Sequence, residues 1–183
     1  MQIIKELHPE IFLIENFLSN KMCNNFIEKG EQVSFEEAKV NIDGKEVMFK
    51  GIRNNKRIIF KDQFIANNIW SQVQPFFKGM FKEYNAIGLN DRFRIYKYDT
   101  GERFKMHRDG SYKKNETESS FLSFLIYLND DFEGGETYFE KGITITPKIG
   151  DALLFYHPLR HEGKPITSGT KYVLRTDVMR KIQ

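Results

Sequence analysis

The chain has 183 residues, of which 40% are hydrophobic and 29% charged, and its formal net charge is +3. This length fits one domain with a substantial core, and the composition argues against a disordered chain. A net charge this small gives little support to a nucleic-acid-binding role. The N-terminus lacks the apolar region of a signal peptide, and no apolar run is long enough to span a membrane. Because Cys23 is the one cysteine, no internal disulfide can form, and we expect a cytoplasmic protein.

The first thirty residues predict a strand followed by a helix. Residues 11–14 are apolar and are expected to form the strand. Ser19 is a suitable N-cap for the helix, which is expected to continue to Gly30. Cys23 falls on or near the apolar face of this helix, where a small buried thiol is the expected role.

Residues 34–60 are harder to interpret. Residues 47–49 and 57–60 suggest two strands that enclose a turn, either as a plain surface hairpin or as a flap over a pocket. The apolar residues from 62 to 84 keep a helical period and predict a helix that lies on the outside of a sheet. Pro75 is expected either to kink this helix or to divide it in two.

After residue 90 the sequence changes to short strands separated by turn residues. This texture, without intervening helices, is typical of a β-sandwich or barrel. We therefore expect a single domain over 1–183, with helical support and a flap in 1–90 and a compact β-unit in 91–180. The strands are expected near residues 93–98, 104–109, 120–128, 136–139, 143–146, 152–156 and 171–178.

A His-x-Asp motif lies in one of these strands. Residues i and i+2 of a strand project from the same face, so His107 and Asp109 are expected to point the same way and Arg108 the other way. One imidazole and one carboxylate form two-thirds of a facial metal triad, and His161 is placed to complete it. Of the remaining histidines, His8 is expected to be exposed and His157 to lie in a loop.

The motifs around these residues occur in a recognisable order. The sequence reads Tyr98-x-x-Gly101-x-x-Phe104-x-x-His107-x-Asp109, then Tyr127-Leu128-Asn129, Gly134-Gly135-Glu136-Thr137, Gly150-Asp151-Ala152-Leu153-Leu154-Phe155, His161-Glu162-Gly163 and Gly169-Thr170-Lys171-Tyr172. This pattern resembles the iron(II)/2-oxoglutarate dioxygenases, in particular the prolyl 4-hydroxylase-like branch. The resemblance covers roughly residues 91–180 and implies a mainly β, α+β fold: a double-stranded β-helix (jelly roll) with N-terminal helices packed on the major sheet.

The resemblance also implies roles for individual residues. It implies that His107, Asp109 and His161 bind Fe(II) and that Lys171 is the buried cation for the distal carboxylate of 2-oxoglutarate. Tyr127 would donate to the same carboxylate and Tyr98 near the metal-bound end, although either tyrosine could simply pack in the core. Leu125 and Thr137 are expected to line the cavity.

Residues outside the motifs are candidates for contacts with substrate. Arg175 lies four positions after Lys171, where it could support the anchor, contact substrate or face outward. The loops at 40–60 and 110–118 are the expected seat of specificity, because loops on a rigid scaffold usually carry it. The candidate substrate contacts are Arg53, Arg57, Arg94, Tyr112 and Arg160.

The resemblance predicts hydroxylation of an unactivated C–H bond, in a prolyl or other amino-acid residue of a protein or peptide. The reaction would consume O2 and decarboxylate 2-oxoglutarate to succinate and CO2, with ascorbate as a reductant. Because Asp109 is retained, hydroxylation is favoured over halogenation. The alternatives are a hydroxylase of a free amino acid or other small molecule, a non-catalytic metal-binding module, a zinc hydrolase and, with little support from charge, a nucleic-acid demethylase.

Overall fold

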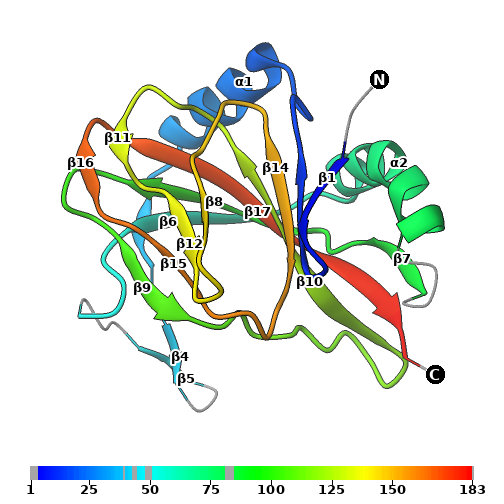
Figure 1. Cartoon of the computed structure of the whole chain (residues 1–183). Helices are drawn as coiled ribbons and strands as arrows, with labels where there is room; N and C mark the ends of the chain where they lie inside the picture. Colours follow the sequence, from blue (N-terminus) through cyan, green and yellow to red (C-terminus); the bar gives the residue numbers. More distant parts are fainter. Residues whose placement is uncertain (1–3, 39, 43–44, 48–50, 81–84, 183) are drawn as a thin grey trace.

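The computed structural model describes residues 4–38, 40–42, 45–47, 51–80 and 85–182. Its larger sheet is antiparallel, in the order β1-β2-β14-β10-β17-β8-β6-β3, and β7 pairs with the second half of β17 (Figure 1). The strands of this sheet are β1 (Ile4–His8), β2 (Ile11–Ile14), β3 (Glu36–Glu37), β6 (Lys56–Lys61), β7 (Ala86–Leu89), β8 (Arg92–Tyr98), β10 (Glu118–Tyr127), β14 (Ala152–Tyr156) and β17 (Lys171–Lys181).

A smaller sheet lies against the larger one and runs in the order β13-β12-β15-β9 (Figure 1). Two further antiparallel pairs, β4 with β5 and β11 with β16, lie outside both sheets. The bounds are β9 (Phe104–His107), β12 (Thr137–Phe139), β13 (Ile143–Ile145), β15 (His161–Gly163), β4 (Val40–Ile42), β5 (Lys45–Val47), β11 (Glu133–Gly134) and β16 (Ile166–Ser168).

Alternation along the central strands divides the buried residues into two clusters. On β10, Phe124 and Ile126 pack with the helices α1 (Asn20–Glu31) and α2 (Gln63–Met80). Tyr127 on the same strand belongs to the second cluster, which includes Phe139 of the smaller sheet. Because successive side chains of a strand point to opposite faces, the larger sheet has helices on one face and the smaller sheet on the other. The predicted jelly-roll core with helices packed on its major sheet is confirmed.

Helix α1 begins as the sequence indicates. The Ser19 hydroxyl accepts a hydrogen bond from the backbone N–H of Met22 at 3.3 Å, which satisfies one of the unpaired donors of the first turn. Cys23 is fully buried, as expected, and Gly30 lies near the end of the helix close to the ring of Phe35. Its small size lets α1 approach the sheet.

Loss of the Ser19 cap gives a direct test of this end of the fold. We expect Ser19→Ala to lower the free energy of unfolding by about 1 kcal/mol, because the N–H of Met22 would lose its acceptor. The measurement is urea unfolding followed by circular dichroism. Ser71→Ala, which removes an exposed hydroxyl within α2, is the matched control and should change stability less.

Helix α2 is one continuous helix through Pro75, as far as Met80, where the described part of this segment ends. The Asp62 carboxylate accepts a hydrogen bond from the N–H of Ile65 at 2.8 Å and caps the first turn. Trp70 is half-buried against Phe77, with ring centroids 5.2 Å apart, and packs on the core. Within the described residues, neither helix is both long and apolar enough to cross a membrane.

The prediction for residues 34–60 is wrong in its pairing. Val47 pairs with Val40 of β4, whereas β6 pairs with β8 along its whole length and with β3 on its other edge. Phe60 stacks on Phe93 at 5.4 Å, so the apolar residues of β6 gain partners in the larger sheet that a surface hairpin could not supply. Residues 48–50 lie outside the described residues. Any flap is thus confined to the chain before residue 56.

The first ninety residues also contribute more than helical support. Strands β1, β2, β3, β6 and β7 all belong to the larger sheet, and β2 extends it by pairing with β14. The two parts of the predicted domain therefore share one sheet, and the later strands depend on the earlier ones for their edge partners.

Candidate active site

Three potential metal-binding side chains meet between the two sheets. His107 ends β9 and His161 begins β15, and the two residues are direct partners in the register of the smaller sheet. Asp109 lies just beyond the strand, where its N–H donates to the carbonyl of His157 at 3.2 Å. The two Nε2 atoms lie 3.6 and 3.7 Å from the Asp109 carboxylate, and all three donor atoms lie within 4.8 Å of one another.

The hydrogen bonds of the two imidazoles orient their free nitrogens toward this space. Nδ1 of His107 lies 2.7 Å from the carbonyl oxygen of Lys105, and Nδ1 of His161 lies 3.0 Å from that of Leu159. Because a carbonyl only accepts, each Nδ1 carries a proton, which leaves Nε2 as the ring nitrogen that can bind a metal. Burial lowers the pKa of His161 to about 4, which keeps it neutral. Two imidazoles and one carboxylate fit the donor set of a ferrous facial triad.

Asp109 is ionised and held from both oxygens. Arg175 Nη1 donates to Oδ1 at 2.8 Å, and the Ser123 hydroxyl donates to Oδ2 at 2.5 Å. Burial alone would raise the pKa of Asp109, but the positive charge of Arg175 outweighs it and holds this pKa well below its usual range. The carboxylate is therefore available as an anionic ligand at neutral pH.

Lys171 lies in the same cavity without an acidic partner. The residue is 4% exposed, and its Nζ donates to the carbonyl of Gly135 at 2.5 Å and lies 5.7 and 5.3 Å from the ring centroids of Tyr98 and Tyr127. Burial lowers the pKa of Lys171 to about 7. Among the described residues no carboxylate lies within ion-pair distance of it, so this buried ammonium is set to receive an anionic ligand.

Position 135, the second of two adjacent glycines, requires a residue without a side chain. Its φ of +68° belongs to the left-handed region, which favours glycine. A Cβ at this position would meet Ile166 Cδ1 within 2.4 Å and Lys171 Cδ within 3.2 Å. The missing side chain thus allows the backbone carbonyl to approach the ammonium group.

The other residues predicted around 2-oxoglutarate line the same cavity, of about 50 Å³. The hydroxyl of Tyr127 lies 2.8 Å from that of Thr137, and both residues are buried. Tyr98 and Leu125 also line the cavity. Tyr98 and Tyr127 belong to the core cluster between the sheets as well, so the two interpretations of these tyrosines are not exclusive.

Arg175 is neither an outward residue nor in contact with Lys171 in this structure. Its guanidinium bonds Asp109 and also Asp177, which in turn contacts Arg94 at 3.5 Å. These four side chains form a chain of alternating charge, Asp109-Arg175-Asp177-Arg94, that extends from the triad. Arg94 therefore lies close to the site, but with an acidic partner of its own.

The remaining candidates for substrate contacts are dispersed. The Arg53 guanidinium lies 4.5 and 4.4 Å from the ring centroids of Tyr96 and Phe104, both of which line the cavity. Phe104 stacks on His107, with ring centroids 3.5 Å apart. Arg57 lies in β6 opposite Tyr96, and Tyr112 is 42% exposed. Arg160 points to Glu140, to which it is bonded at 2.6 Å, and does not line the cavity.

Two buried polar residues near Asp109 were not anticipated. Ser123 bonds Asp109 directly, and His157, interpreted from sequence only as a loop residue, is buried and bonds Ser123. The sequence did contain a signal for these residues, because Ser120 and Ser123 interrupt the apolar run at 120–128. A buried hydroxyl requires a partner, which could have directed attention to these positions.

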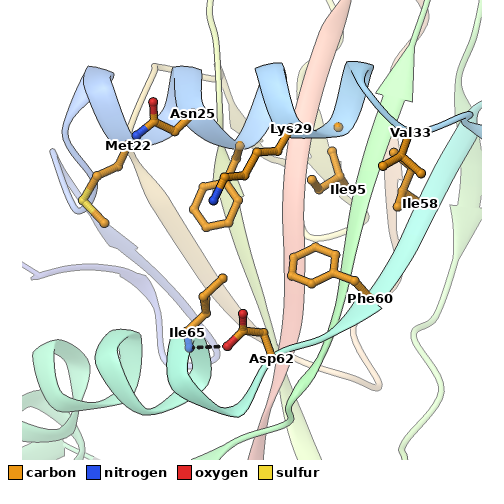
Figure 2. Close-up of a pocket in the computed structure, with 11 residues that line it drawn as sticks. Met22, Asn25, Lys29, Val33, Ile58, Phe60, Asp62, Ile65 and Ile95 are labelled. Carbon is orange, nitrogen blue, oxygen red and sulfur yellow. Dashed lines mark hydrogen bonds between the residues drawn. The ribbon is translucent and has the colours of Figure 1, made fainter.

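A larger cavity, of about 400 Å³, lies on the helical face of the larger sheet (Figure 2). Figure 2 shows Met22, Asn25 and Lys29 reaching into it from α1, opposite Phe60 of β6 and Ile65 of α2. It contains no histidine and is mostly apolar, so it offers no ligand set for a transition metal. We place the chemistry in the smaller cavity because the triad and Lys171 lie there.

Comparison with known proteins agrees with this geometry. A sequence model of the 2OG-Fe(II) oxygenase superfamily matches residues 93–176, which include the triad, Lys171 and Arg175. A putative prolyl 4-hydroxylase of Acanthamoeba polyphaga mimivirus is 27% identical over 190 residues, covering 93% of this chain and 74% of the viral protein. The chain is thus similar to the 2OG-Fe(II) oxygenase superfamily, and to its prolyl 4-hydroxylase-like branch, over the part that holds the candidate site.

Two further proteins extend the comparison. Probable prolyl 4-hydroxylase 7 of Arabidopsis thaliana is 23% identical over 197 residues, which cover 90% of this chain but 60% of the plant protein. The structure of the viral collagen prolyl hydroxylase of Paramecium bursaria Chlorella virus-1, in complex with 2OG, superposes with a TM-score of 0.68 at 19% identity, covering 93% and 96% of the two chains. The expected enzyme class, a dioxygenase that uses Fe(II), 2-oxoglutarate and O2, is confirmed.

Proposed function

We propose that this dioxygenase hydroxylates a prolyl residue of a protein or peptide. The observation that carries the proposal is the His107-Asp109-His161 triad beside the buried, unpaired ammonium of Lys171. The substrate class is supported by the relatives, which are named a putative prolyl 4-hydroxylase of a virus and a probable prolyl 4-hydroxylase of a plant, and by the similar fold of a viral collagen prolyl hydroxylase.

In this proposal the triad holds Fe(II), with Nε2 of both histidines and one Asp109 oxygen as ligands. Fe(II), 2-oxoglutarate and O2 together supply the oxidising power for a C–H hydroxylation, while 2-oxoglutarate becomes succinate and CO2. Lys171 binds the distal carboxylate of 2-oxoglutarate, because a carboxylate in this buried cavity needs a cationic partner. The cavity around it is lined by Tyr98, Tyr127, Leu125 and Thr137. The hydroxyl of Tyr127 or Thr137 can donate a hydrogen bond to the same ligand.

The substrate side of the proposed site is the aromatic and cationic group next to His107. The guanidinium of Arg53 lies against the rings of Tyr96 and Phe104, and its buried Nη2 has no hydrogen-bond partner among the described residues. A guanidinium in this state can donate to the backbone carbonyl of an extended peptide. Tyr112, on the loop that follows Asp109, is exposed and can contact the same peptide. Arg57, Arg94 and Arg160 have weaker support, because Arg94 and Arg160 already pair with acidic residues.

The direct test is oxidation of defined peptides. Purified protein is incubated with Fe(II), 2-oxoglutarate, O2 and a panel of proline-containing peptides, and products are analysed by mass spectrometry for the gain of one oxygen, alongside succinate. We expect oxidised peptide in proportion to succinate, and none when alanine replaces the proline or when the variant is His161→Ala. Oxidation of free amino acids without oxidation of any peptide would contradict the peptide assignment.

Two further features belong to the same proposal. Ascorbate is expected to increase the number of turnovers as a reductant, measured as succinate formed with and without it.

A cytoplasmic location is supported by the single cysteine, Cys23, which is buried and unpaired. Fractionation of the source cells, with an antibody against the chain, would test this location.

A further inference from the structure

Asp109 is connected to a row of buried hydrogen-bonding groups that the chemistry described above does not use. The Ser123 hydroxyl lies 2.5 Å from Asp109 Oδ2 and 3.1 Å from Nδ1 of His157. Nε2 of His157 lies 2.9 Å from the Ser120 hydroxyl, which accepts the N–H of Tyr112 at 2.7 Å. Ser120, Ser123 and His157 are each at most 4% exposed.

The chemistry of these groups leaves one arrangement of protons. An ionised carboxylate only accepts, so the single hydroxyl proton of Ser123 points to Asp109. The Ser123 oxygen must then accept from His157, which places the imidazole proton on Nδ1. Nε2 is left as an acceptor for the hydroxyl of Ser120. Every donor in the row points toward the carboxylate, from the N–H of Tyr112 to Asp109.

We propose that Ser123 and His157 act as a positioning pair that fixes the orientation of Asp109 at the metal site. Arg175 holds only Oδ1, and a carboxylate held at one oxygen can still rotate about its last bond. The Ser123 hydroxyl holds the second oxygen, and His157 prevents that hydroxyl from turning elsewhere. His157 acts through Ser123 and touches neither substrate nor the reacting atoms, so it is a positioning residue.

The same row reaches the loop that we expect to contact substrate. Tyr112 bonds Ser120 through its backbone, and the Ser111 hydroxyl bonds the carbonyl of Ser120 at 2.6 Å. The N–H of Asp109 in turn bonds the carbonyl of His157. The start of the 110–118 loop is thus held by Ser120, and the backbone of Asp109 is held by His157, which itself bonds Ser120. A change at His157 is expected to disturb both ends.

The primary test measures metal affinity without any substrate, so it does not depend on the proposed prolyl activity. Mn(II) binding to the metal-free protein is followed by electron paramagnetic resonance of the free ion. We expect Ser123→Ala to weaken Mn(II) binding about 10-fold or more, the lower end of the range for second-layer partners of metal ligands. Ser123→Thr, which keeps the hydroxyl, should restore most of the affinity. Ser119→Ala, a buried serine of the same strand outside the row, is the matched control and should bind as the wild type does.

A double-mutant cycle tests whether His157 acts through Ser123. His157→Leu alone should weaken Mn(II) binding by a similar factor, and in the Ser123→Ala background it should add less than about twofold, because the path is already broken. Independent, additive effects would overturn the role of His157, and wild-type Mn(II) affinity in Ser123→Ala would overturn the proposal as a whole. If His157→Leu does not fold, the Ser123→Ala and Ser123→Thr pair decides. In turnover, both single variants should release more succinate per oxidised peptide than the wild type.

Discussion

Replacing Lys171 by methionine is expected to weaken 2-oxoglutarate binding by at least about 30-fold, which corresponds to roughly 2 kcal/mol, the lower end for truncating a buried charge pair. Methionine matches the lysine stem in length, so the substitution removes the charge and little volume. The distal carboxylate would then be buried without a cation. The measurement is titration calorimetry with 2-oxoglutarate and Mn(II) in place of Fe(II). Lys164→Met, a partly exposed lysine above the ring of Tyr138, is the matched control and should leave the affinity unchanged.

The lowered pKa of Lys171 adds a pH dependence with a definite sign. In the free protein burial lowers this pKa to about 7, and a bound carboxylate would raise it again. Above pH 7, 2-oxoglutarate binding must therefore take up a proton, and its affinity should fall by up to about tenfold per pH unit. Lys171→Arg stays charged and should lack this fall. Equal slopes in the wild type and the arginine variant would contradict the assignment of Lys171 as the anchor.

The same pKa predicts the effect of Lys171 on stability without ligand. Its folded pKa is lower than its unfolded pKa, so the charged form opposes folding. This penalty is fully present below pH 7, and it declines as pH rises toward the ordinary lysine value. In the absence of 2-oxoglutarate, Lys171→Met should thus stabilise the fold, more at pH 6 than at pH 10. The residue would be retained for binding at a cost to stability.

Asp109→Asn is expected to abolish tight metal binding and also to destabilise the metal-free protein by roughly 3 kcal/mol, because it breaks a buried ion pair with Arg175. Arg175 keeps Asp177 as a partner, which places the estimate at the lower end of the range for such pairs. The measurement is urea unfolding in the presence of a chelator. Asp99→Asn removes a half-exposed ion pair with Lys56 at 2.7 Å and serves as the control, with an expected cost below about 1 kcal/mol.

The pH dependence of stability provides an independent check on Asp109. Its folded pKa is depressed, so its contribution is fully present above the unfolded carboxyl value and is lost as pH falls through the folded pKa. The difference in unfolding free energy between wild type and Asp109→Asn should therefore shrink in strong acid. A constant difference between pH 7 and pH 2 would show that the aspartate charge is not what stabilises Arg175.

The site could be anticipated from sequence wherever its residues follow strand geometry. His107 and His161 were placed together by motif and spacing, and the structure pairs them across two adjacent strands. Arg108 donates to the carbonyl of Pro158 and does not line the cavity, as predicted, but Arg108 and Asp109 both lie past the end of β9, so strand alternation does not place them. Asp109 is held instead by its N–H to the carbonyl of His157. Ser19 and Cys23 were predictable because capping and helical period are local properties.

What could not be predicted depends on contacts between distant segments. Nothing local in residues 56–61 indicates that they join β8, because strand partners are chosen by the whole sheet. The partners of Arg175 and His157 likewise come from residues 66 and 34 positions away, namely Asp109 and Ser123. Spacing along the chain contains no information on such pairs unless a motif has already placed both members.

The distribution of the triad between the sheets has a consequence for motion. Both histidines belong to the small four-stranded sheet, whereas Asp109 is fastened to the large sheet through Ser123 of β10 and Arg175 of β17. In the metal-free protein the two sheets are joined by these polar contacts and by the buried cluster between them, which includes Tyr127 and Phe139. An ion bound by all three side chains would cross-link the two sheets. Local separation of the sheets would then also require dissociation of the ion. Amide protons of β9 and β15 would then change from exchange by local opening to exchange by unfolding of the whole domain. The metal-bound active site would therefore stabilise the packing of the two sheets as well as carry out the reaction.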